Sequence, residues 1–401
     1  MKKQKNKYEL LAPAGDFSML VAAVNAGADA VYFGLKEFNM RDAAKNFTIK
    51  DLDKIGEICN KKVKKYLTLN TIIYDSEIKK LENIIKKIKN KVDAVICWDF
   101  AVVELCRKYR IPFFISTQAS VSNSKSAEFY KKLGAKRIVL ARELNLKQIK
   151  KISGIIDIEC FCHGAMCVSV SGRCFTSQFL FNCSANRGKC LHPCRRAYFV
   201  KDDEGNELKI ENSRIFSAKD LCTLPFIEKM KKAGIKSFKI EGRNRDARYV
   251  ETVVKIYKKA LDKKLSKKEI GESLEELKKI YNKGFSSGFY IKIPTSDDFS
   301  KIEHSSATEK KHFVGKVTRY FPKINVAAIK LVSELKVGDK ISVIGKTTGI
   351  VNLKIEKIEI NRQPVEIGEK GREIGIKIPL VRKNDEVYLI RYNSEKEKIK
   401  N

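Results

Sequence analysis

Short apolar runs alternate with longer segments of helical period along the first two thirds of the chain. A short apolar run bounded by turn residues is consistent with a buried strand, and apolar positions three and four residues apart indicate a helix. Eight strands are expected, at residues 9–12, 30–33, 66–73, 94–97, 113–116, 137–140, 155–161 and 237–240. Helical segments lie between most of them, for example at residues 17–26, 76–90, 123–133 and 146–152. The pattern therefore predicts an α/β fold of repeated strand-then-helix units.

Eight such units are the number that closes a parallel barrel. The preferred fold class is a TIM-type (β/α)8 barrel over residues 1–293, with a cysteine-rich insertion at about residues 160–216, between the seventh and eighth strands. A doubly wound open sheet is the alternative, because strand boundaries inferred from sequence are imprecise. In a barrel, the groups that carry chemistry are expected at the carboxyl ends of the strands.

The pattern changes near residue 293. Residues 294–311 are rich in Ser, Thr and Asp and lack an apolar period, which is typical of a linker. Residues 312–401 contain short alternating segments separated by turn sequences such as Val337-Gly338-Asp339, and end in a lysine-rich tail. This predicts a small β-barrel domain with a basic tail, of the kind appended to proteins that act on RNA. A purely structural or dimerisation role fits the same pattern.

The chain is strongly basic, with 81 Lys and Arg against 48 Asp and Glu and a net charge of +33. Such an excess favours a polyanionic partner such as nucleic acid, although a lysine-rich proteome would give the same total. Eight of the eighteen arginines fall between residues 173 and 248. Because arginine binds phosphates bidentately, a functional RNA-binding patch is expected there.

The cysteines define the most distinctive stretch. The N-terminal residues lack an uninterrupted apolar segment before Glu9, and no stretch reaches the roughly 18 apolar residues of a membrane span, so a cytoplasmic protein is expected. Its eleven cysteines should then be thiols rather than disulfides. Seven of them lie between residues 159 and 196, among Gly, Asn, Ser and Arg. These polar loop positions favour ligands or reactive groups. Three of the others, Cys59, Cys97 and Cys106, are expected in the core.

The spacing of the clustered cysteines bears on the choice of metal. Structural zinc sites usually take pairs separated by two to four residues. Six residues separate Cys167 from Cys174, Cys190 lies sixteen positions beyond Cys174, and only Cys190 with Cys194 approaches the zinc spacing. Thiolates from scattered loop positions suit an iron-sulfur cluster at least as well. Spacing alone therefore slightly favours iron-sulfur and leaves zinc open.

A longer pattern here resembles the signature of peptidase family U32, whose members were long called collagenase-like peptidases. It runs His163-Gly-Ala-Met-Cys167, then six residues, then Cys174. The segments ELLAPAGD (9–16), VYFG (31–34), SAKDLC (217–222) and KIEGR (239–243) agree, so the resemblance covers nearly the whole chain. Several members of that family are oxygen-independent hydroxylases with a 4Fe-4S cluster. Their substrates are a tRNA wobble uridine, a cytidine of large-subunit ribosomal RNA, or a ubiquinone precursor.

The resemblance carries expectations about this chain. It implies a tRNA hydroxylase that forms 5-hydroxyuridine at the wobble position, with prephenate, a small dicarboxylate, as oxygen donor and a homologous protein as an additional partner. It places the 4Fe-4S ligands at Cys167, Cys174, Cys190 and Cys222, with Cys194 as the rival for the fourth place. The alternatives are ribosomal RNA cytidine hydroxylation, a cluster-bearing subunit that only binds RNA, and the peptidase of the family's older name. A peptidase would need a thiolate beside a histidine base, and His163 has Cys162 and Cys167 near it in sequence.

Polar and ionisable side chains recur at the expected carboxyl ends of the strands. The candidate catalytic residues among them are Arg142, Glu143, Glu159, His163, Glu241 and Arg243. Arginines paired with carboxylates would hold a small dicarboxylate and supply an acid or base. Taken singly, each is equally explained as part of a polar loop. The long segment 34–47 is expected to be either a lid over the barrel or a surface connection. Residues 200–210 are expected to form a β-hairpin.

Overall fold

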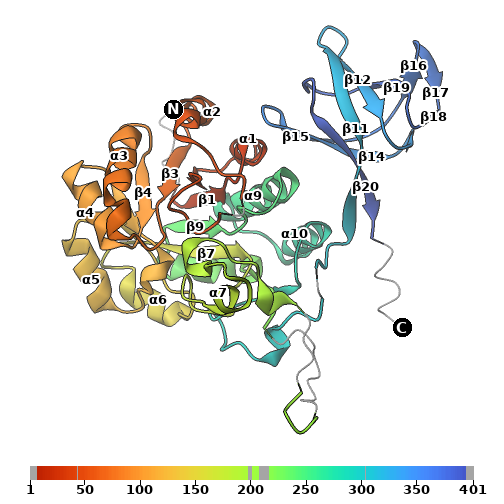
Figure 1. The fold of residues 1–401 in the computed structure, drawn as a ribbon. Coiled ribbons are helices and arrows are strands. Elements are labelled where there is room, and N and C mark those ends of the chain that lie inside the picture. Colours follow the sequence, from red (N-terminus) through yellow and green to blue (C-terminus); the bar gives the residue numbers. More distant parts are fainter. Residues whose placement is uncertain (1–6, 43, 197–200, 207–215, 303, 394–401) are drawn as a thin grey trace.

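A computed structural model describes residues 7–42, 44–196, 201–206, 216–302 and 304–393, and its larger part is a closed parallel barrel (Figure 1). The eight barrel strands are β1 (Glu9–Pro13), β2 (Ala30–Gly34), β3 (Lys64–Thr68), β4 (Ala94–Cys97), β5 (Phe113–Ile115), β6 (Arg137–Val139), β7 (Asp157–Gly164) and β9 (Ser237–Ile240). Each strand pairs in parallel with the next, and β9 closes the ring between β7 and β1. The predicted TIM-type barrel is confirmed, and the open doubly wound alternative is wrong.

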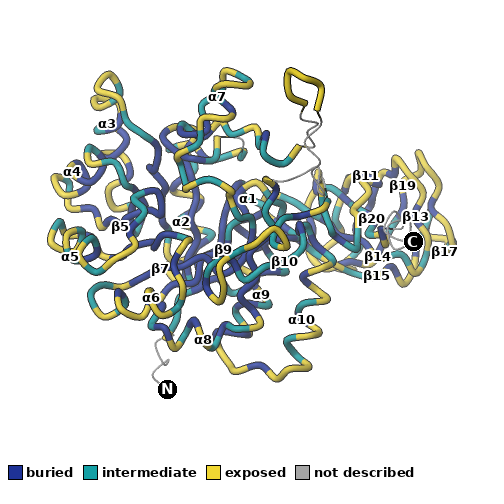
Figure 2. The backbone as a smooth tube through the Cα atoms, turned by 90° about the horizontal axis from the view of Figure 1, so that it is seen from below, coloured by how far each residue is buried: buried dark blue, intermediate teal, exposed yellow. Residues whose placement is uncertain are grey.

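Helices cover the outside of the barrel. They are α1 (Phe17–Asn25), α2 (Leu52–Cys59), α3 (Ile78–Ile88), α4 (Phe100–Lys108), α5 (Ser124–Lys132), α6 (Leu146–Ile152), α8 (Ile227–Lys232), α9 (Ala247–Asp262) and α10 (Lys267–Lys279). Several begin at an Asp or Asn side chain that accepts a hydrogen bond from the first turn, as Asp99 does for α4 and Asp246 for α9. Their apolar faces pack on the strands, so buried residues follow the barrel wall and exposed ones the outer helix faces (Figure 2). Cys59, Cys97 and Cys106 lie in this core, as expected.

Two strand boundaries differ from the prediction in ways that affect the site. β3 ends at Thr68 rather than residue 73, because the chain then turns to give Asn70 backbone and side-chain contacts with residues 38 and 40. β7 continues to Gly164, and the unpredicted strand β8 (Asp220–Cys222) pairs antiparallel with its end. The short strand β10 (Phe285–Ser286) lies beside β8. The insertion therefore occupies residues 165–219 and contains α7 (Thr176–Phe181).

The C-terminal part is all β, as predicted, and forms an antiparallel sheet. Its strands are β11 (Glu309–Phe321), β12 (Val326–Leu331), β14 (Lys340–Gly345), β15 (Gly349–Lys354), β16 (Ile358–Ile360), β17 (Gln363–Val365), β19 (Glu373–Lys377) and β20 (Glu386–Tyr392). Their order is β15-β14-β20-β11-β12-β19-β16-β17, and β13 (Leu335–Lys336) pairs separately with β18 (Ile367–Gly368). The sheet has its own apolar core. The basic tail at 394–401 and most of the hairpin expected at 200–210 lie outside the described residues.

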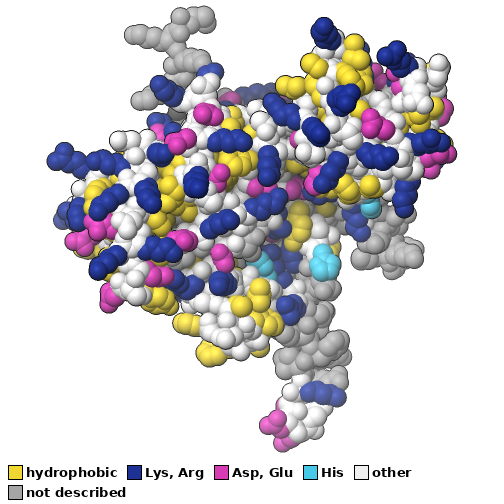
Figure 3. Space-filling view, turned by 45° about the horizontal axis from the view of Figure 1, so that its top comes forward, with side chains coloured by type: hydrophobic (Ala, Val, Ile, Leu, Met, Phe, Trp, Pro, Cys, Tyr) yellow, Lys and Arg dark blue, Asp and Glu magenta, His cyan; other side chains and the backbone are white. Residues whose placement is uncertain are grey.

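The sheet docks against the barrel through α1 and α9. Ala22 of α1, Ala247 of α9 and Ile350 of β15 form a small shared core. Gly349 has a φ of +72°, and a Cβ there would come within 2.8 Å of Val21, so glycine permits this close approach. None of the helices that the structure describes is both long and apolar enough to cross a bilayer. Lys and Arg side chains are spread over both parts on the face drawn in Figure 3, so the positive charge is not confined to the insertion.

Candidate active site

A cavity of about 630 Å³ lies at the carboxyl end of the barrel, beneath the insertion. Strand ends form its floor, through Tyr32, Thr68, Phe161 and Lys239. Met40 and Arg41 from segment 34–47, residues of the loops after the strands, and the insertion form the walls. A cavity of roughly 300–1,000 Å³ at this end of a barrel is the usual place and size for a small-molecule site.

Glu241, which follows β9, is the central carboxylate of this cavity. Its Oε1 accepts a hydrogen bond from Arg41 Nε at 3.3 Å, and its Oε2 accepts one from the Tyr32 hydroxyl at 3.3 Å. Burial alone would raise the pKa of Glu241, but Arg41, Arg142 and Arg243 outweigh it and lower the pKa to about 2. Glu241 is therefore a permanent carboxylate near neutral pH.

Two further arginines complete a cationic cage around Glu241. Arg243 is almost fully buried, donates to Thr68 Oγ1 at 3.2 Å, and has its pKa lowered to about 10 by burial. A Cβ at Gly34 would overlap its guanidinium, so glycine at that position makes room for it. The Arg142 guanidinium lies 3.8 Å from the centre of the Phe161 ring and donates to the Ala165 carbonyl at 2.8 Å.

The cage carries more positive than negative charge. Arg41, Arg142, Arg243 and Lys239 line the cavity with Glu241 as the facing carboxylate. Arg142 Nε is buried and has no hydrogen-bond partner among the described residues. A buried donor without a partner is costly, and arginines bind carboxylates through paired hydrogen bonds. The arrangement therefore suits a small dianion.

Glu159 lies below the cavity rather than in its wall. It is fully buried, and its carboxylate accepts hydrogen bonds from Lys239 Nζ at 2.9 Å and Arg137 Nη1 at 3.2 Å. Burial would raise its pKa, but these two cations lower it. The sequence placed Glu159 at a strand end, whereas β7 runs on to Gly164 and leaves it inside the barrel. Glu159 thus acts on the cavity only through Lys239.

His163 and Glu143 also lie away from the cavity. His163 Nδ1 is 3.3 Å from the Tyr257 hydroxyl, and its ring packs among those of Tyr249, Tyr257 and Phe285. Burial and then Arg245 lower the pKa of His163 to about 3, so the ring is neutral. Glu143 is exposed, and the described cavity wall does not include it. Of the six candidate catalytic residues, the structure brings together Arg142, Glu241 and Arg243.

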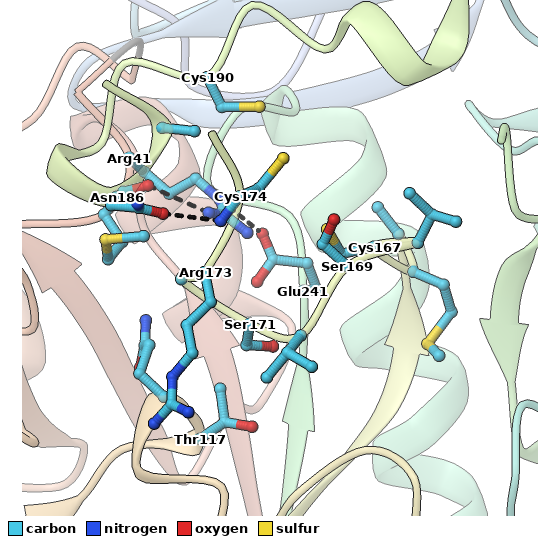
Figure 4. Close-up of a pocket in the computed structure, with 18 of the residues that line it drawn as sticks. Arg41, Thr117, Cys167, Ser169, Ser171, Arg173, Cys174, Asn186, Cys190 and Glu241 are labelled. Carbon is cyan, nitrogen blue, oxygen red and sulfur yellow. Dashed lines mark hydrogen bonds and ion pairs between the residues drawn. The ribbon is translucent and has the colours of Figure 1, made fainter. Parts of the chain in front are cut away.

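Four cysteines of the insertion line the same cavity: Cys167, Cys174, Cys190 and Cys194. Figure 4 shows the first three around the Arg41–Glu241 pair. The backbone N–H of Cys174 donates to Asn186 Oδ1 at 2.8 Å, and Ser177 Oγ lies 4.0 Å from Cys190 Sγ. All four thiols are at least partly accessible, in contrast to the core cysteines.

Cys222 does not join these four. It is 4% exposed in β8, and its Sγ lies 3.6 Å from the Tyr257 hydroxyl, on the side of His163. Its neighbours across β7 place it outside the described cavity wall. The structure thus groups Cys194, the predicted rival, with the three other predicted ligands.

The thiol arrangement bears on which metal group would fit. Within the described ranges, no three His, Cys, Asp or Glu side chains are arranged to hold a single metal ion. Four thiols nevertheless border one cavity from separate loop positions. A 4Fe-4S cluster takes one thiolate on each of its four irons, so it needs thiols around a volume rather than at one point. The donor set therefore fits a cluster better than one zinc ion.

The geometry does not provide a cysteine-peptidase dyad at His163. Cys162 is fully buried in the core, where burial raises the pKa of its thiol well above the usual value. A nucleophilic cysteine needs an accessible thiolate beside its base. Cys167, the other cysteine close in sequence, faces the cavity that His163 does not line.

Arg41 is one of the charged cavity residues that the set of candidate catalytic residues lacked; Lys239 is another. The sequence marks Arg41 only as part of segment 34–47, and its contact with Glu241 joins positions 200 residues apart. An arginine in an unusually long loop after a barrel strand is the one signal that points to it. Gly188 of the insertion holds this segment in place, since its carbonyl accepts from the Asp42 N–H at 3.3 Å.

Comparison with known proteins gives a family and several relatives. The family described as Peptidase family U32 matches residues 15–299. A protein named collagenase from Porphyromonas gingivalis is 42% identical over 406 residues, covering 96% of this chain and 98% of its own length. The tRNA hydroxylation protein P1 of Bacillus subtilis is 35% identical over 354 residues, 84% of each chain. A 23S rRNA 5-hydroxycytidine synthase of Escherichia coli is 38% identical over 261 residues, 64% of this chain and 40% of its own length.

Proposed function

Because this chain belongs to peptidase family U32, we propose that it is an RNA hydroxylase that forms 5-hydroxyuridine at the wobble position of tRNA. The names of the tRNA hydroxylation protein and the rRNA hydroxycytidine synthase support the reaction class. One observation carries the proposal: four accessible cysteines and an arginine cage line the same cavity. In this proposal, the cysteines would hold a redox centre and the arginines would bind an anion in the same cavity.

The cysteines would hold a 4Fe-4S cluster, with Cys167, Cys174, Cys190 and Cys194 as ligands. Replacing C5–H of uridine by C5–OH is a two-electron oxidation of the base, and the co-substrate that exchanges its hydroxyl for the hydrogen is reduced by the same two electrons. When bound, a 4Fe-4S cluster supplies electron-transfer chemistry beside the substrate. The protein's own part is to position the thiols, through contacts such as that of Asn186 with the Cys174 N–H.

The arginine cage would bind prephenate, the proposed oxygen donor, through its two carboxylates. Arg142 and Arg243 offer guanidinium groups, and Glu241 fixes the orientation of Arg41. Charge-assisted hydrogen bonds of this type are about twice as strong as neutral ones. The cavity of about 630 Å³ has room for a small dianion and for one base taken out of its stack. Lys239 would be held in place by its ion pair with Glu159.

Nucleoside analysis tests the proposal. The gene is deleted in its host, and digests of tRNA and ribosomal RNA are compared with the parent strain by mass spectrometry. We expect a hydroxylated uridine to disappear from tRNA and to return with the intact gene, but not with Cys167→Ala or Arg142→Ala. Cys183→Ala is the matched control, since Cys183 lies in the insertion but outside the described cavity wall.

The possible outcomes separate the alternatives. If a hydroxylated cytidine disappears from ribosomal RNA instead, the substrate is ribosomal RNA and not tRNA. If the digests of both RNAs are unchanged and the metal-free protein cleaves denatured collagen, the hydroxylase proposal is overturned. The peptidase function would then be the remaining explanation.

A further inference from the structure

The helix α7 leaves large apolar side chains in solvent. Phe179 is 85% exposed, Phe175 62% and Leu180 54%, all within two turns. Burying an apolar side chain of this size is favourable, so clustered exposure marks a surface that another molecule covers. The helix is anchored on its opposite side, where Ser177 is fully buried and accepts from the Leu191 N–H at 3.2 Å.

This aromatic surface is continuous with the cavity. Leu180 and Thr176 of α7 line the cavity, as do the exposed side chains of Val168 and Val170. Figure 2 shows α7 as a largely exposed segment standing out from the barrel. The ring centroids of Phe175 and Phe179 are 6.3 Å apart and the ring planes are tilted by 54°, so the rings are not stacked face to face, and both side chains are largely exposed. The two rings therefore belong to the same short segment as Thr176 and Leu180, which line the cavity.

The charge around the rings identifies the class of molecule. Residues 160–196 contain no Asp or Glu and five Lys or Arg residues. Arg173 and Arg195 line the cavity, and the Arg196 guanidinium lies 4.7 Å from the centre of the Phe181 ring. Aromatic rings interleaved with arginines and free of acidic residues form the surface that single-stranded nucleic acid prefers. A second copy of this basic chain or a basic protein would be repelled.

We propose that Phe175 and Phe179 form a stacking platform for an unpaired RNA base next to the base held in the cavity. Arg195 and Arg196 then contact the phosphates on either side. A paired stem cannot use the platform, because its bases are stacked within the helix. The inference rests on the proposed function for the identity of the substrate, and it adds the selection of a loop over a stem.

Binding measurements test the platform without turnover. The full-length protein is titrated into a labelled RNA stem-loop with a seven-nucleotide loop and, separately, into the same stem as a blunt duplex. We expect Phe179→Ala to bind the stem-loop roughly 10-fold more weakly and the duplex unchanged, because the stacking of one base is removed. Phe179→Trp should bind like the native protein. Phe129→Ala removes another exposed ring, on α5 and away from the cavity wall, and is the control.

Salt dependence separates stacking from charge. Phe179→Ala should leave the slope of log K against log salt unchanged, whereas combined Arg195→Ala and Arg196→Ala should flatten it by about 0.7 for each phosphate that the protein no longer binds. Native-like selectivity for the loop in Phe179→Ala would overturn the platform. A change of oligomeric state in sedimentation would overturn it too, by showing an interface between copies. Loop selection through Phe179 without any RNA modification in cells would instead overturn only the hydroxylase proposal.

Discussion

Arg187 and Glu77 form a two-point ion pair that fastens the cysteine-rich insertion to the barrel. Arg187 Nη1 lies 2.9 Å from Glu77 Oε2, Nη2 lies 2.5 Å from Oε1, and the guanidinium is 4.6 Å from the centre of the Tyr74 ring. Arg187 ends η4 (Ala185–Arg187), three residues before Cys190, and Glu77 directly precedes α3. Both side chains are about three-quarters buried, so solvent screens the pair less than a surface pair.

Removing this pair should destabilise the proposed 4Fe-4S cluster without changing any of its proposed cysteine ligands. In Glu77→Gln, Arg187 loses its counter-charge, and the loop carrying Cys190 gains freedom. We expect anaerobically reconstituted protein to lose its visible absorbance in air several-fold faster than the native chain. Glu82→Gln is the control, because Glu82 pairs with Lys108 on the outer surface. Equal bleaching rates for Glu77→Gln and Glu82→Gln would contradict the anchoring role.

Ligand identity can be decided by two cysteine substitutions. We expect Cys194→Ser to lose most iron and acid-labile sulfide, because Cys194 lines the cavity with Cys167, Cys174 and Cys190. Cys222→Ser should retain both, since the Cys222 thiol faces Tyr257 instead. The reverse result would support the ligand set implied by the family resemblance. Stoichiometric zinc in place of iron would exclude the cluster altogether.

The barrel was predictable because its signal is local. The short runs at residues 94–97 and 237–240 coincide with β4 and β9. A four-residue run between two helical segments is too short for a helix and is typical of a buried strand. β8 was missed because it has only three residues and exists through its pairing with the far end of β7. A strand that forms mainly through pairing with a segment distant in sequence shows little apolar pattern in its own residues.

The site was predictable only in part, for related reasons. Arg142, Glu241 and Arg243 follow strands whose ends were placed well, and they line the cavity. Glu159 was misplaced because the expected end of β7 fell three residues short of Gly164. Arg41 could not be assigned, since its role depends on a carboxylate 200 residues away.

Opposite changes in the cage should have opposite effects on anion binding. Arg142→Ala removes a cation and should weaken prephenate binding by roughly 10- to 100-fold, the size of one charge-assisted hydrogen bond. Glu241→Gln removes the facing carboxylate and should strengthen binding. Because the pKa of Glu241 is about 2, neither effect should vary between pH 6 and 8. Calorimetric titration of prephenate checks both, and weaker binding by Glu241→Gln would contradict an electrostatic cage.

The buried His163 should make the fold sensitive to mild acid. Its folded-state pKa of about 3 lies below its ordinary value of 6.5, so the unfolded chain binds a proton that the folded chain excludes. Stability is therefore complete above pH 6.5 and falls as the pH drops toward 3. One such group contributes about 2 kcal/mol to the loss between pH 7 and 5. His192, whose pKa burial lowers to about 4, acts in the same direction.

His163→Phe should remove this part of the acid sensitivity. A phenyl ring can occupy the space among Tyr249, Tyr257 and Phe285, and the Tyr257 hydroxyl keeps its bond to the Cys162 carbonyl at 2.9 Å. The variant gives up the hydrogen bond between His163 and Tyr257, but its unfolding free energy should change less between pH 7 and 5. Urea unfolding at both pH values measures this difference. The exposed His312→Phe is the control. An identical pH dependence in His163→Phe and the native protein would mean that the pKa of His163 is the same in the folded and unfolded states.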